Sequence, residues 1–257
     1  MINRKTTEEI ALMREGGEKL GTIREALMKY AQPGVMLTDI EKLASDLIDK
    51  SGGAASFKQV KGYRWATCLC VNEVVVHGIP NEYILRHGDL LTIDIGLVYG
   101  GFHTDTASSK IVGVDTSPDK EKKESFLQVG YDTLMGAIDL CRIGHRIGEI
   151  SASNQKMIEG AGYSIVKSLV GHGVGHELHE DPQIPNYTRG QIEHTYQFQG
   201  GETVAIEPIY VMGNPSVIYE SDDGWTIATR DRSLAAVFEH SVAVTENGPL
   251  ILTKAKI

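Results

Sequence analysis

Residues 90–111 have the sequence LLTIDIGLVYGGFHTDTASSKI. Two apolar-rich segments flank Tyr99-Gly100-Gly101, a pattern typical of a β-hairpin. A turn near Gly100 places Asp94 and Asp105 almost opposite each other, and the two-residue period of a strand lets them share a face. Burying two neighbouring carboxylates is unfavourable unless a cation or a shared proton neutralises them. The hairpin therefore predicts either a metal site or a proton-sharing pair.

The bulk composition is that of an ordinary globular protein. The 257 residues suit one large α/β domain or two small ones, and 41% of them are hydrophobic. A net charge of -9 without a long Lys/Arg run argues against stable nucleic-acid binding, although it leaves a transient ribosome contact through a small patch open. Three cysteines favour a reducing compartment, so we expect the cytoplasm. The sequence has neither an apolar signal core near residue 1 nor a membrane-length apolar run.

Helices and strands follow the same order in the two halves of the sequence. Capping-box patterns at Thr6–Glu9 and Thr38–Glu41 predict two helices that end near residues 33 and 52. Ser117-Pro118 predicts the start of a third helix, which runs toward Gly144. The remaining predicted elements are a helix at 147–159 and strands at 66–76, 164–170, 204–211 and 236–244.

Two motifs recur in the same order along the chain. Gly88-Asp89-x-x-x-Ile93-Asp94 has the same spacing as Gly201-Glu202-x-x-x-Ile206-Glu207, and His77-x-x-Pro80 matches His179-x-x-Pro182. We interpret these matches as an internal duplication, with pseudo-symmetric halves of about 1–115 and 116–257 in a single catalytic domain, 1–257. Unrelated strand and turn residues are the alternative.

Four acidic residues interrupt apolar strand patterns: Asp94, Asp105, Glu207 and Glu239. Ionised carboxylates are rare in such patterns unless they are paired or bound to metal. His172, which we expect in a glycine-rich loop after a strand, completes a set of one imidazole and four carboxylates. Five oxygen-rich ligands favour two divalent ions bridged by carboxylates.

The other histidines and the cysteines carry weaker signals. Residues 171–180, GHGVGHELHE, lack the H-E-x-x-H pattern of a zinc helix, and their glycines favour a loop. We expect His179 to be an acid/base group and His176 a surface or supporting residue. His77 could simply be a core histidine, but its match to His179 favours a functional role. Cys68 and Cys70 fit small wall residues better than a soft-metal site.

The motifs together resemble one known family, the type I methionine aminopeptidases in their short bacterial form. The resemblance covers nearly the whole chain. It rests on HGIP (77–80), IDIG (93–96), GFHTDT (101–106), GHGVGHELHEDP (171–182), VAIEP (204–208) and DGWTIATRDRSLAAVFEH (223–240).

This resemblance implies the pita-bread fold, a pseudo-symmetric α/β arrangement around an antiparallel sheet with two divalent ions of cobalt, manganese, iron or zinc. Asp105 and Glu239 match the bridging ligands, His172 and Glu207 the further ligands of one ion, and Asp94 that of the other. A metal-bridging hydroxide would attack the peptide bond after an N-terminal methionine when the next side chain is small. The matching roles are general base for Glu207, carbonyl stabilisation for His179, and contact with the peptide nitrogen for His77.

The resemblance also implies a methionine pocket and a second, weaker ion site. The pocket positions match Tyr63, Cys68, His77, Leu178 and Trp225, with Leu178 in place of a frequent phenylalanine. Phe57 and Val60 stand where some members have a cysteine and a tyrosine. Asn72 and Ser233 match positions around a monovalent cation in some members. The family further implies a monomer that acts on nascent or newly made chains.

Two other functions fit parts of the pattern. An aminopeptidase P or prolidase, which acts on Xaa-Pro bonds, would use the same fold and ligand set, but such enzymes usually carry an additional N-terminal domain. A metal-free peptide-binding relative would be expected to lack some of the five ligands, all of which are present here.

Overall fold

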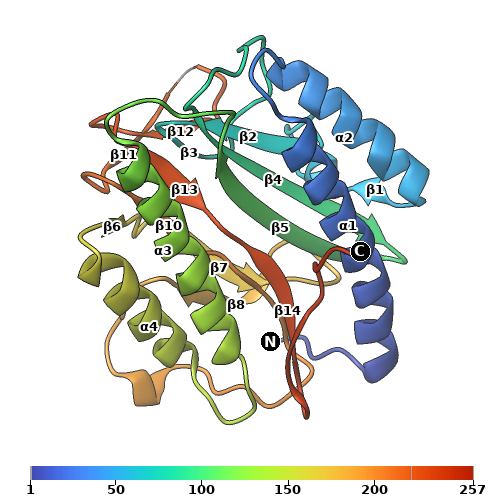
Figure 1. Ribbon diagram of the computed structural model, residues 1–257. Helices are drawn as coiled ribbons and strands as arrows, with labels where there is room; N and C mark the ends of the chain where they lie inside the picture. Colours follow the sequence, from blue (N-terminus) through green and yellow to red (C-terminus); the bar gives the residue numbers. More distant parts are fainter. Residues whose placement is uncertain (1, 221, 257) are drawn as a thin grey trace.

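Two pairs of helices lie on opposite sides of a set of β-strands (Figure 1). The computed structural model describes residues 2–220 and 222–256. One pair consists of α1 (Thr7–Tyr30) and α2 (Leu37–Ser51), and the other of α3 (Lys120–Asp139) and α4 (Ile147–Gly160). Strands follow each pair, so the order of helix, helix and strands occurs twice along the chain.

The strands of the described residues form four antiparallel sheets. The first contains β1 (Ala54–Ala55), β2 (Thr67–Val71), β4 (Leu90–Tyr99) and β5 (Phe102–Ile111), all paired with β4. A five-stranded sheet has the order β15 (Gly248–Ile251), β14 (His240–Thr245), β9 (Thr203–Ile206), β7 (Val170–Gly173), β8 (Glu180–Pro185). The two smaller sheets are β13 (Ala235–Val237), β10 (Ile209–Val211), β6 (Ser164–Ile165) and β11 (Val217–Tyr219), β12 (Ile227–Thr229), β3 (Val74–Val76). Short 3-10 helices occupy Phe57–Gln59 and Ile192–His194.

The predicted hairpin is present as β4 and β5. Gly100 and Gly101 both have positive φ, 58° and 85°, as a two-residue type I′ turn requires. Asp94 pairs with Ala107, and Asp105 pairs with Gly96. The two aspartates therefore lie on one face of the hairpin as diagonal neighbours. Asp94 is two residues away from Gly96, the residue directly opposite Asp105.

Helix α1 begins as its sequence predicts, whereas α2 does not. Thr6 and Glu9 form a complete capping box. The predicted second box is wrong, because α2 begins at Leu37 and its N-cap residue makes no side-chain cap bond. The Glu41 carboxylate instead accepts hydrogen bonds from the backbone N–H groups of Ala66 and Thr67 and from the Thr67 hydroxyl. This acidic residue thus ties α2 to the start of β2.

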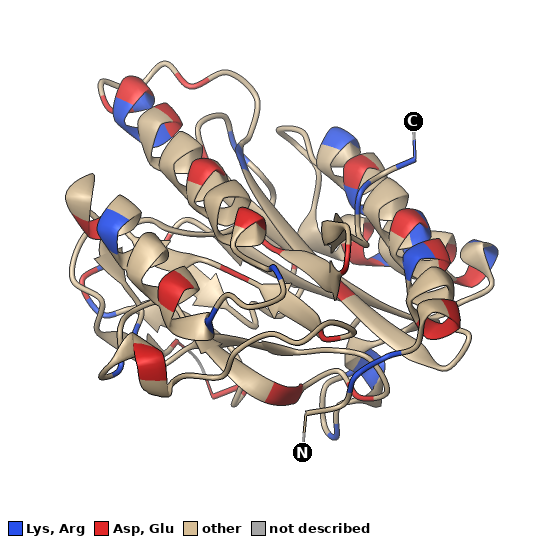
Figure 2. Cartoon of the chain, turned by 90° about the horizontal axis from the view of Figure 1, so that it is seen from below, with Lys and Arg blue, Asp and Glu red and all other residues tan. Residues whose placement is uncertain are grey.

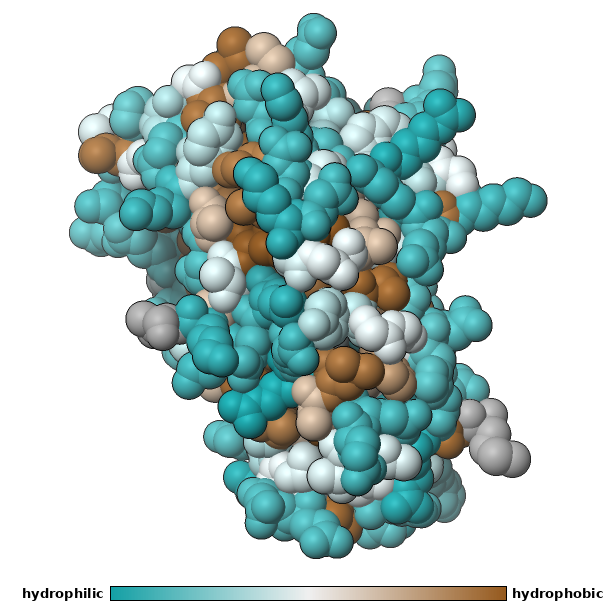
Figure 3. Space-filling view, turned by 90° about the vertical axis from the view of Figure 1, so that its right-hand side faces the viewer, coloured by the Kyte–Doolittle hydropathy of each residue, from teal (hydrophilic) through white to brown (hydrophobic). Residues whose placement is uncertain are grey.

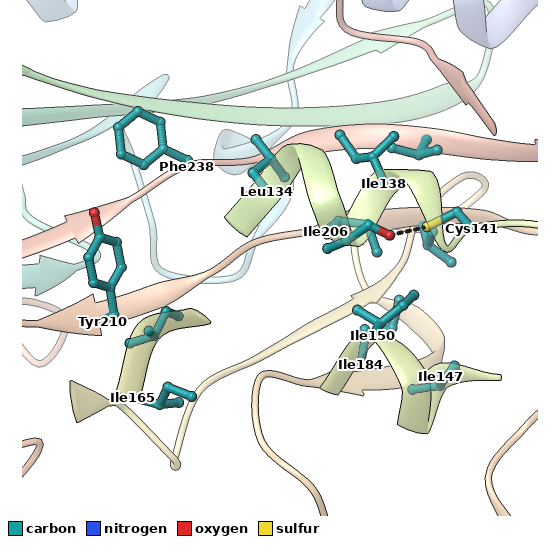
Figure 4. Close-up of a cluster of buried hydrophobic side chains, with 14 of the residues drawn as sticks. Leu134, Ile138, Cys141, Ile147, Ile150, Ile165, Ile184, Ile206, Tyr210 and Phe238 are labelled. Carbon is teal, nitrogen blue, oxygen red and sulfur yellow. Dashed lines mark hydrogen bonds between the residues drawn. The ribbon is translucent and has the colours of Figure 1, made fainter. Parts of the chain in front are cut away.

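Helices α3 and α4 cover an apolar core (Figure 4) that is distinct from the core beneath α1 and α2. Leu134 and Ile138 of α3, Ile150 of α4 and Tyr210 of β10 are among its buried side chains. Helix α3 is shorter than expected at both ends, because it begins at Lys120 and ends at Asp139. The predicted strand at 164–170 is divided into β6 and β7.

Hydroxyl side chains join the hairpin to the second half of the chain. The expected strand at 236–244 breaks between β13 and β14, at Phe238-Glu239. There the Glu239 N–H donates to the Ala107 carbonyl at 2.9 Å, and the Thr106 hydroxyl donates to the Glu239 carbonyl at 2.8 Å. The Ser241 hydroxyl accepts from the Asp105 N–H at 2.8 Å and donates to the Asp105 carbonyl at 2.9 Å. These bonds place Asp105 beside Glu239.

The outer surface is polar and carries both signs of charge. Basic and acidic residues are interspersed along the helices, whereas the strands between them carry few charges (Figure 2). The face on the side of α1 and α2 is mainly hydrophilic, with small, scattered apolar areas (Figure 3). Among the described residues we find no helix with the length and apolar character of a membrane span.

Candidate active site

A cavity of about 140 Å³ lies where the hairpin, β7 and the ends of β3, β9 and β13 meet. It brings together the five predicted metal ligands, the two predicted catalytic histidines and the predicted pocket residues. Its lining consists of Phe57, Val60, Tyr63, Cys68, Val76, His77, Asp94, Asp105, His172, Leu178, His179, Glu207, Trp225 and Glu239. Acidic groups and histidines therefore share one cavity with an apolar wall.

The acidic side chains converge around His172. Ligand atoms of Asp105, His172 and Glu239 all lie within 4.8 Å of one another. The Nε2 atom of His172 is 3.4 Å from Oε1 of Glu207. His172 belongs to strand β7, not to the loop that its neighbouring glycines suggested, because Gly171 and His172 pair with neighbouring strands. A strand position fixes the direction of the imidazole more firmly than a loop would.

Burial makes the charged forms of these carboxylates unfavourable. It raises the pKa of Asp94 to about 7 and the pKa values of Asp105, Glu207 and Glu239 well above their ordinary range. Neighbouring carboxylates raise the last three further. Such a cluster must bind protons or cations at neutral pH.

Two details show that the cluster fits a divalent cation. Asp94 lines the cavity, and its Oδ1 is fully buried without a hydrogen-bond partner, so one buried acceptor is unsatisfied. Burial lowers the pKa of His172 to about 4, so its ring is neutral. Its Nδ1 lies 2.9 Å from the Gly173 carbonyl and donates to it, which leaves the Nε2 lone pair facing Glu207. Two acceptors that face each other need a cation or a proton between them.

An apolar wall stands beside the acidic cluster. Phe57, Tyr63, Cys68 and Leu178 are buried together, with Val60 and Trp225 packed against them. The Tyr63 ring meets that of Trp225 edge-on at 5.1 Å, and its hydroxyl donates to the Thr67 carbonyl at 2.8 Å. Burial raises the thiol pKa of Cys68 well above its usual value and that of Cys70 to about 12. Both thiols are therefore protonated in the metal-free protein. Cys68 belongs to the apolar wall, whereas Cys70 is buried in β2 outside the cavity lining.

Two further histidines, His77 and His179, reach the cavity, whereas His176 does not. His77 follows β3 with a φ of 57°, an uncommon value for a side chain of its size. The His179 ring lies 4.4 Å from that of His172. Burial lowers the pKa of His77 and of His179. His176 lies away from the cavity lining, where it packs on Phe102 and approaches Glu9.

Asn72 and Ser233, the residues of the predicted monovalent-cation site, are not part of the cavity lining. The Asn72 side chain donates to Asp89 and accepts from the Leu90 N–H. The Ser233 hydroxyl donates to Asp231 at 2.7 Å. The monovalent cation stays a prediction.

Several residues that support the site were not identified from the sequence. Ser241 and Thr106 hold Asp105 and Glu239 in place, but isolated hydroxyls in strands carry no recognisable pattern. Arg24 of α1 is buried and donates to the Thr106 hydroxyl at 2.6 Å, and its charge lowers the pKa of Glu239. In the sequence it looks like an ordinary helix surface residue. Val76 precedes His77 and completes the cavity wall.

Residues 11–246 match Metallopeptidase family M24. The chain is 38% identical to methionine aminopeptidase 1 of Bacillus subtilis, with 99% of this chain and 100% of the relative covered. It superposes on the crystal structure of a methionine aminopeptidase from Thermotoga maritima with a TM-score of 0.93 and 39% identity, covering 99% and 100% of the two chains. A prolidase from Pyrococcus furiosus gives a TM-score of 0.76 at 21% identity, with 99% of this chain and 66% of the prolidase covered, which shows the fold alone.

These similarities confirm the expected fold class, since the structural neighbours share the pita-bread fold. With a family match over most of its length and relatives above 30% identity from end to end, the chain belongs to Metallopeptidase family M24, among its methionine aminopeptidases.

Proposed function

We propose that this protein hydrolyses the peptide bond after an N-terminal methionine, with a preference for a small second residue. The observation that carries the proposal is a single cavity in which a buried acidic cluster adjoins an apolar wall. Full-length relatives at 33–38% identity are named methionine aminopeptidase, which supports the same reaction. The substrate is the N-terminus of a nascent or newly made protein.

Asp94, Asp105, His172, Glu207 and Glu239 are the residues that would hold the divalent ions. Membership of family M24 implies the use of divalent metal. We propose two ions, because five ligands exceed what one ion with bound water usually takes. The oxygen-rich set suits cobalt, manganese, iron or zinc. Bound there, such ions supply Lewis acidity to the carbonyl and lower the pKa of water toward neutrality.

The protein's own side chains orient the substrate and move protons. Glu207 is the general base, because its carboxylate reaches the cavity beside His172, where the divalent ions would be held. His179 donates a hydrogen bond to the carbonyl oxygen as the carbon becomes tetrahedral. His77 lies near the Trp225 ring at 6.4 Å, where it contacts the peptide nitrogen at the end of the methionine pocket.

The apolar wall provides the methionine pocket. A thioether side chain is polarizable and has no hydrogen-bond requirement, so it suits a surface of aromatic and aliphatic groups. Aromatic rings of Phe57, Tyr63 and Trp225 meet edge-on here, and sulfur interacts well with ring edges. Leu178 and Val60 complete the wall with aliphatic groups.

We further propose that the protein acts as a cytoplasmic monomer, without stable nucleic-acid or membrane binding. Its net charge of -9 supports this proposal, and a ribosome contact would be transient and confined to a small patch.

Peptide cleavage before and after metal removal tests the proposed function. The purified protein is stripped with chelator, and cleavage of Met-Ala, Met-Leu and Ala-Pro peptides is measured with and without each candidate ion. We expect Met-Ala to be cleaved fastest and only with metal. Activity that survives complete chelation contradicts the metal-dependent mechanism. Cleavage of Ala-Pro alone indicates the Xaa-Pro specificity of a prolidase instead.

A further inference from the structure

Residues 174–179 connect β7 to β8 and carry two groups of the cavity, Leu178 in its wall and His179 beside His172. The N-terminal residues before α1 pack against this segment. The Gly175 carbonyl accepts a hydrogen bond from the His103 N–H at 2.6 Å, so one side of the segment is attached to β5. The other side is attached to Lys5.

Lys5 is buried to an extent that is unusual for a lysine, because its side chain has 0% exposure. Its ammonium donates to Oε2 of Glu180 and to the Asn3 carbonyl. The other oxygen of Glu180 accepts from the Glu177 N–H at 3.0 Å. Glu180 is the residue directly after His179, so the ammonium is linked through one carboxylate to both ends of the turn that contains Leu178 and His179.

The lysine stem also supports the segment by direct packing. A β-carbon at Gly175 would collide with Cε and Nζ of Lys5, so the stem lies against this glycine with no space between them. The Lys5 N–H donates to the Gly201 carbonyl at 2.7 Å, which attaches the lysine to the start of the segment before β9. Lys5 thus joins the N-terminal residues to two segments that are distant in the sequence, one at Gly175–Glu180 and one at Gly201.

We propose that Lys5 is a positioning residue for catalysis, which sets the location of Leu178 and His179 through its ion pair with Glu180 and its packing against Gly175. This inference rests on the proposed function for its catalytic meaning. Removing the ammonium leaves Glu180 without its cation in a nearly buried position, and the turn relaxes toward solvent to hydrate it. The metal ligands lie outside this turn, and His172 keeps its strand pairing.

A second ion pair in the chain provides a matched control. Lys123 and Asp115 are also nearly buried, with side-chain exposures of 14% and 3% and an Nζ–Oδ2 distance of 2.9 Å. Lys123 likewise donates to a backbone carbonyl, that of Gly88. Neither residue lines the cavity. Replacing either lysine by methionine removes one buried ammonium, but only Lys5 contacts the turn before β8.

The first experiment compares Lys5→Met with Lys123→Met in the metal-loaded protein. We expect both to lower the unfolding temperature. Lys5→Met alone should reduce kcat/KM for a Met-Ala peptide by about 10- to 100-fold, mainly through kcat, because a misplaced His179 acts in the transition state. Its metal affinity, measured by calorimetry, should match that of the unchanged protein. Equal kcat/KM for the two variants would overturn the proposal.

The second experiment needs no substrate. Amide hydrogen exchange of residues 174–180, followed by mass spectrometry, should be faster in Lys5→Met than in Lys123→Met. Glu180→Gln, which keeps the size and the acceptor oxygen of this side chain, should show a smaller increase in the same peptide. Unchanged exchange at 174–180 in both Lys5→Met and Glu180→Gln rules out the positioning role. Faster exchange in a protein that cleaves no Met-Ala peptide would instead contradict only the proposed function.

Discussion

The acidic residues of the cluster are held by two different kinds of backbone. Asp94 and Asp105 lie inside β4 and β5, two ten-residue strands whose ladder is continuous from end to end. Glu207 and Glu239 lie at interruptions, one between β9 and β10 and the other between β13 and β14. The first pair is therefore placed by regular strand geometry, and the second pair by gaps in it.

Each arrangement has its own structural requirement. A continuous ladder satisfies its backbone groups internally and fixes the spacing of side chains by register. An interruption lets a carboxylate turn toward the cavity but leaves backbone groups that need other partners. Asn186 donates to the Glu207 carbonyl at 2.8 Å, and Ala107 and Thr106 bond the backbone of Glu239. The hairpin can form locally, whereas Glu239 depends on bonds to the hairpin and Glu207 on a bond to Asn186.

The largest effect on metal binding is expected from a substitution in the β4–β5 ladder. Asp105→Asn keeps the size and strand pairing of the residue but removes a charge from the centre of the cluster. We expect metal affinity to fall by at least about 100-fold, since even loss of a supporting group commonly costs 10- to 100-fold, and activity to be nearly abolished. Atomic absorption and peptide cleavage measure the two effects. Asp115→Asn, a buried acid after β5 outside the cavity, is the control and should retain metal.

His179→Ala tests whether this histidine of the second half acts in catalysis and not in metal binding. His179 lies in the turn before β8, and its proposed partner is the substrate carbonyl. We expect the variant to bind metal normally and to lose about 10²- to 10³-fold in kcat, as is typical when one transition-state hydrogen bond is removed. Should the variant lose its metal as well, His179 would be a ligand and the role assigned to His172 would need revision.

The same contrast explains how much of the structure could be predicted from the sequence. The hairpin follows from its Gly-Gly turn and apolar strands, and the α1 capping box and the fold class were also predicted correctly. The acids of the second half were identified as candidates because apolar neighbours surround them. Their breaks in the strands were missed, since nothing local in the residues around Glu239 distinguishes an interrupted strand from a continuous one.

Tertiary contacts overrode the local signals elsewhere. Thr38 and Glu41 have capping-box spacing, but Glu41 is used by β2 and the helix begins earlier. Glycines around His172 suggested a loop, yet pairing with the flanking strands keeps it in β7. The contribution of Lys5 to the site could not be predicted, because its partner Glu180 is distant in the sequence.

Removing the metal should change how stability depends on pH. In the metal-free protein the folded-state pKa values of Asp105, Glu207 and Glu239 are raised. The folded protein therefore keeps protons on these carboxyl groups at pH values where the unfolded chain has released them. That stability is present at low pH and is lost as pH rises through the folded-state values. Above about pH 7 the histidines are neutral in both states and contribute little.

We therefore expect the unfolding temperature of the metal-free protein to fall between about pH 7 and pH 9, by about 3–5 °C per pH unit for each carboxyl group that is still protonated in the folded protein. The metal-loaded protein, whose ions replace those protons, should show a smaller decline. Thermal denaturation in chelator and in excess metal across this range makes the comparison. Parallel pH profiles in the two conditions would mean that the acids ionise without difficulty and that burial is not what makes them bind metal.

The smallest effect is expected when one hydroxyl group is removed, either beside the interrupted strand that carries Glu239 or within the hairpin. Ser241→Ala removes both bonds that join β14 to the backbone of Asp105, whereas Thr92→Val removes a 2.7 Å hydroxyl bond to Ser109 within the hairpin. Each change should cost about 1–3 kcal/mol of unfolding free energy, because both sites are buried. Only Ser241→Ala should also weaken metal binding, by about 10-fold, because it loosens the contact between Asp105 and Glu239. Equal metal affinities in the two variants would show that the Ser241 bonds are not needed for metal binding, and that the bonds of Ala107 and Thr106 to Glu239 suffice to join the two parts of the cluster.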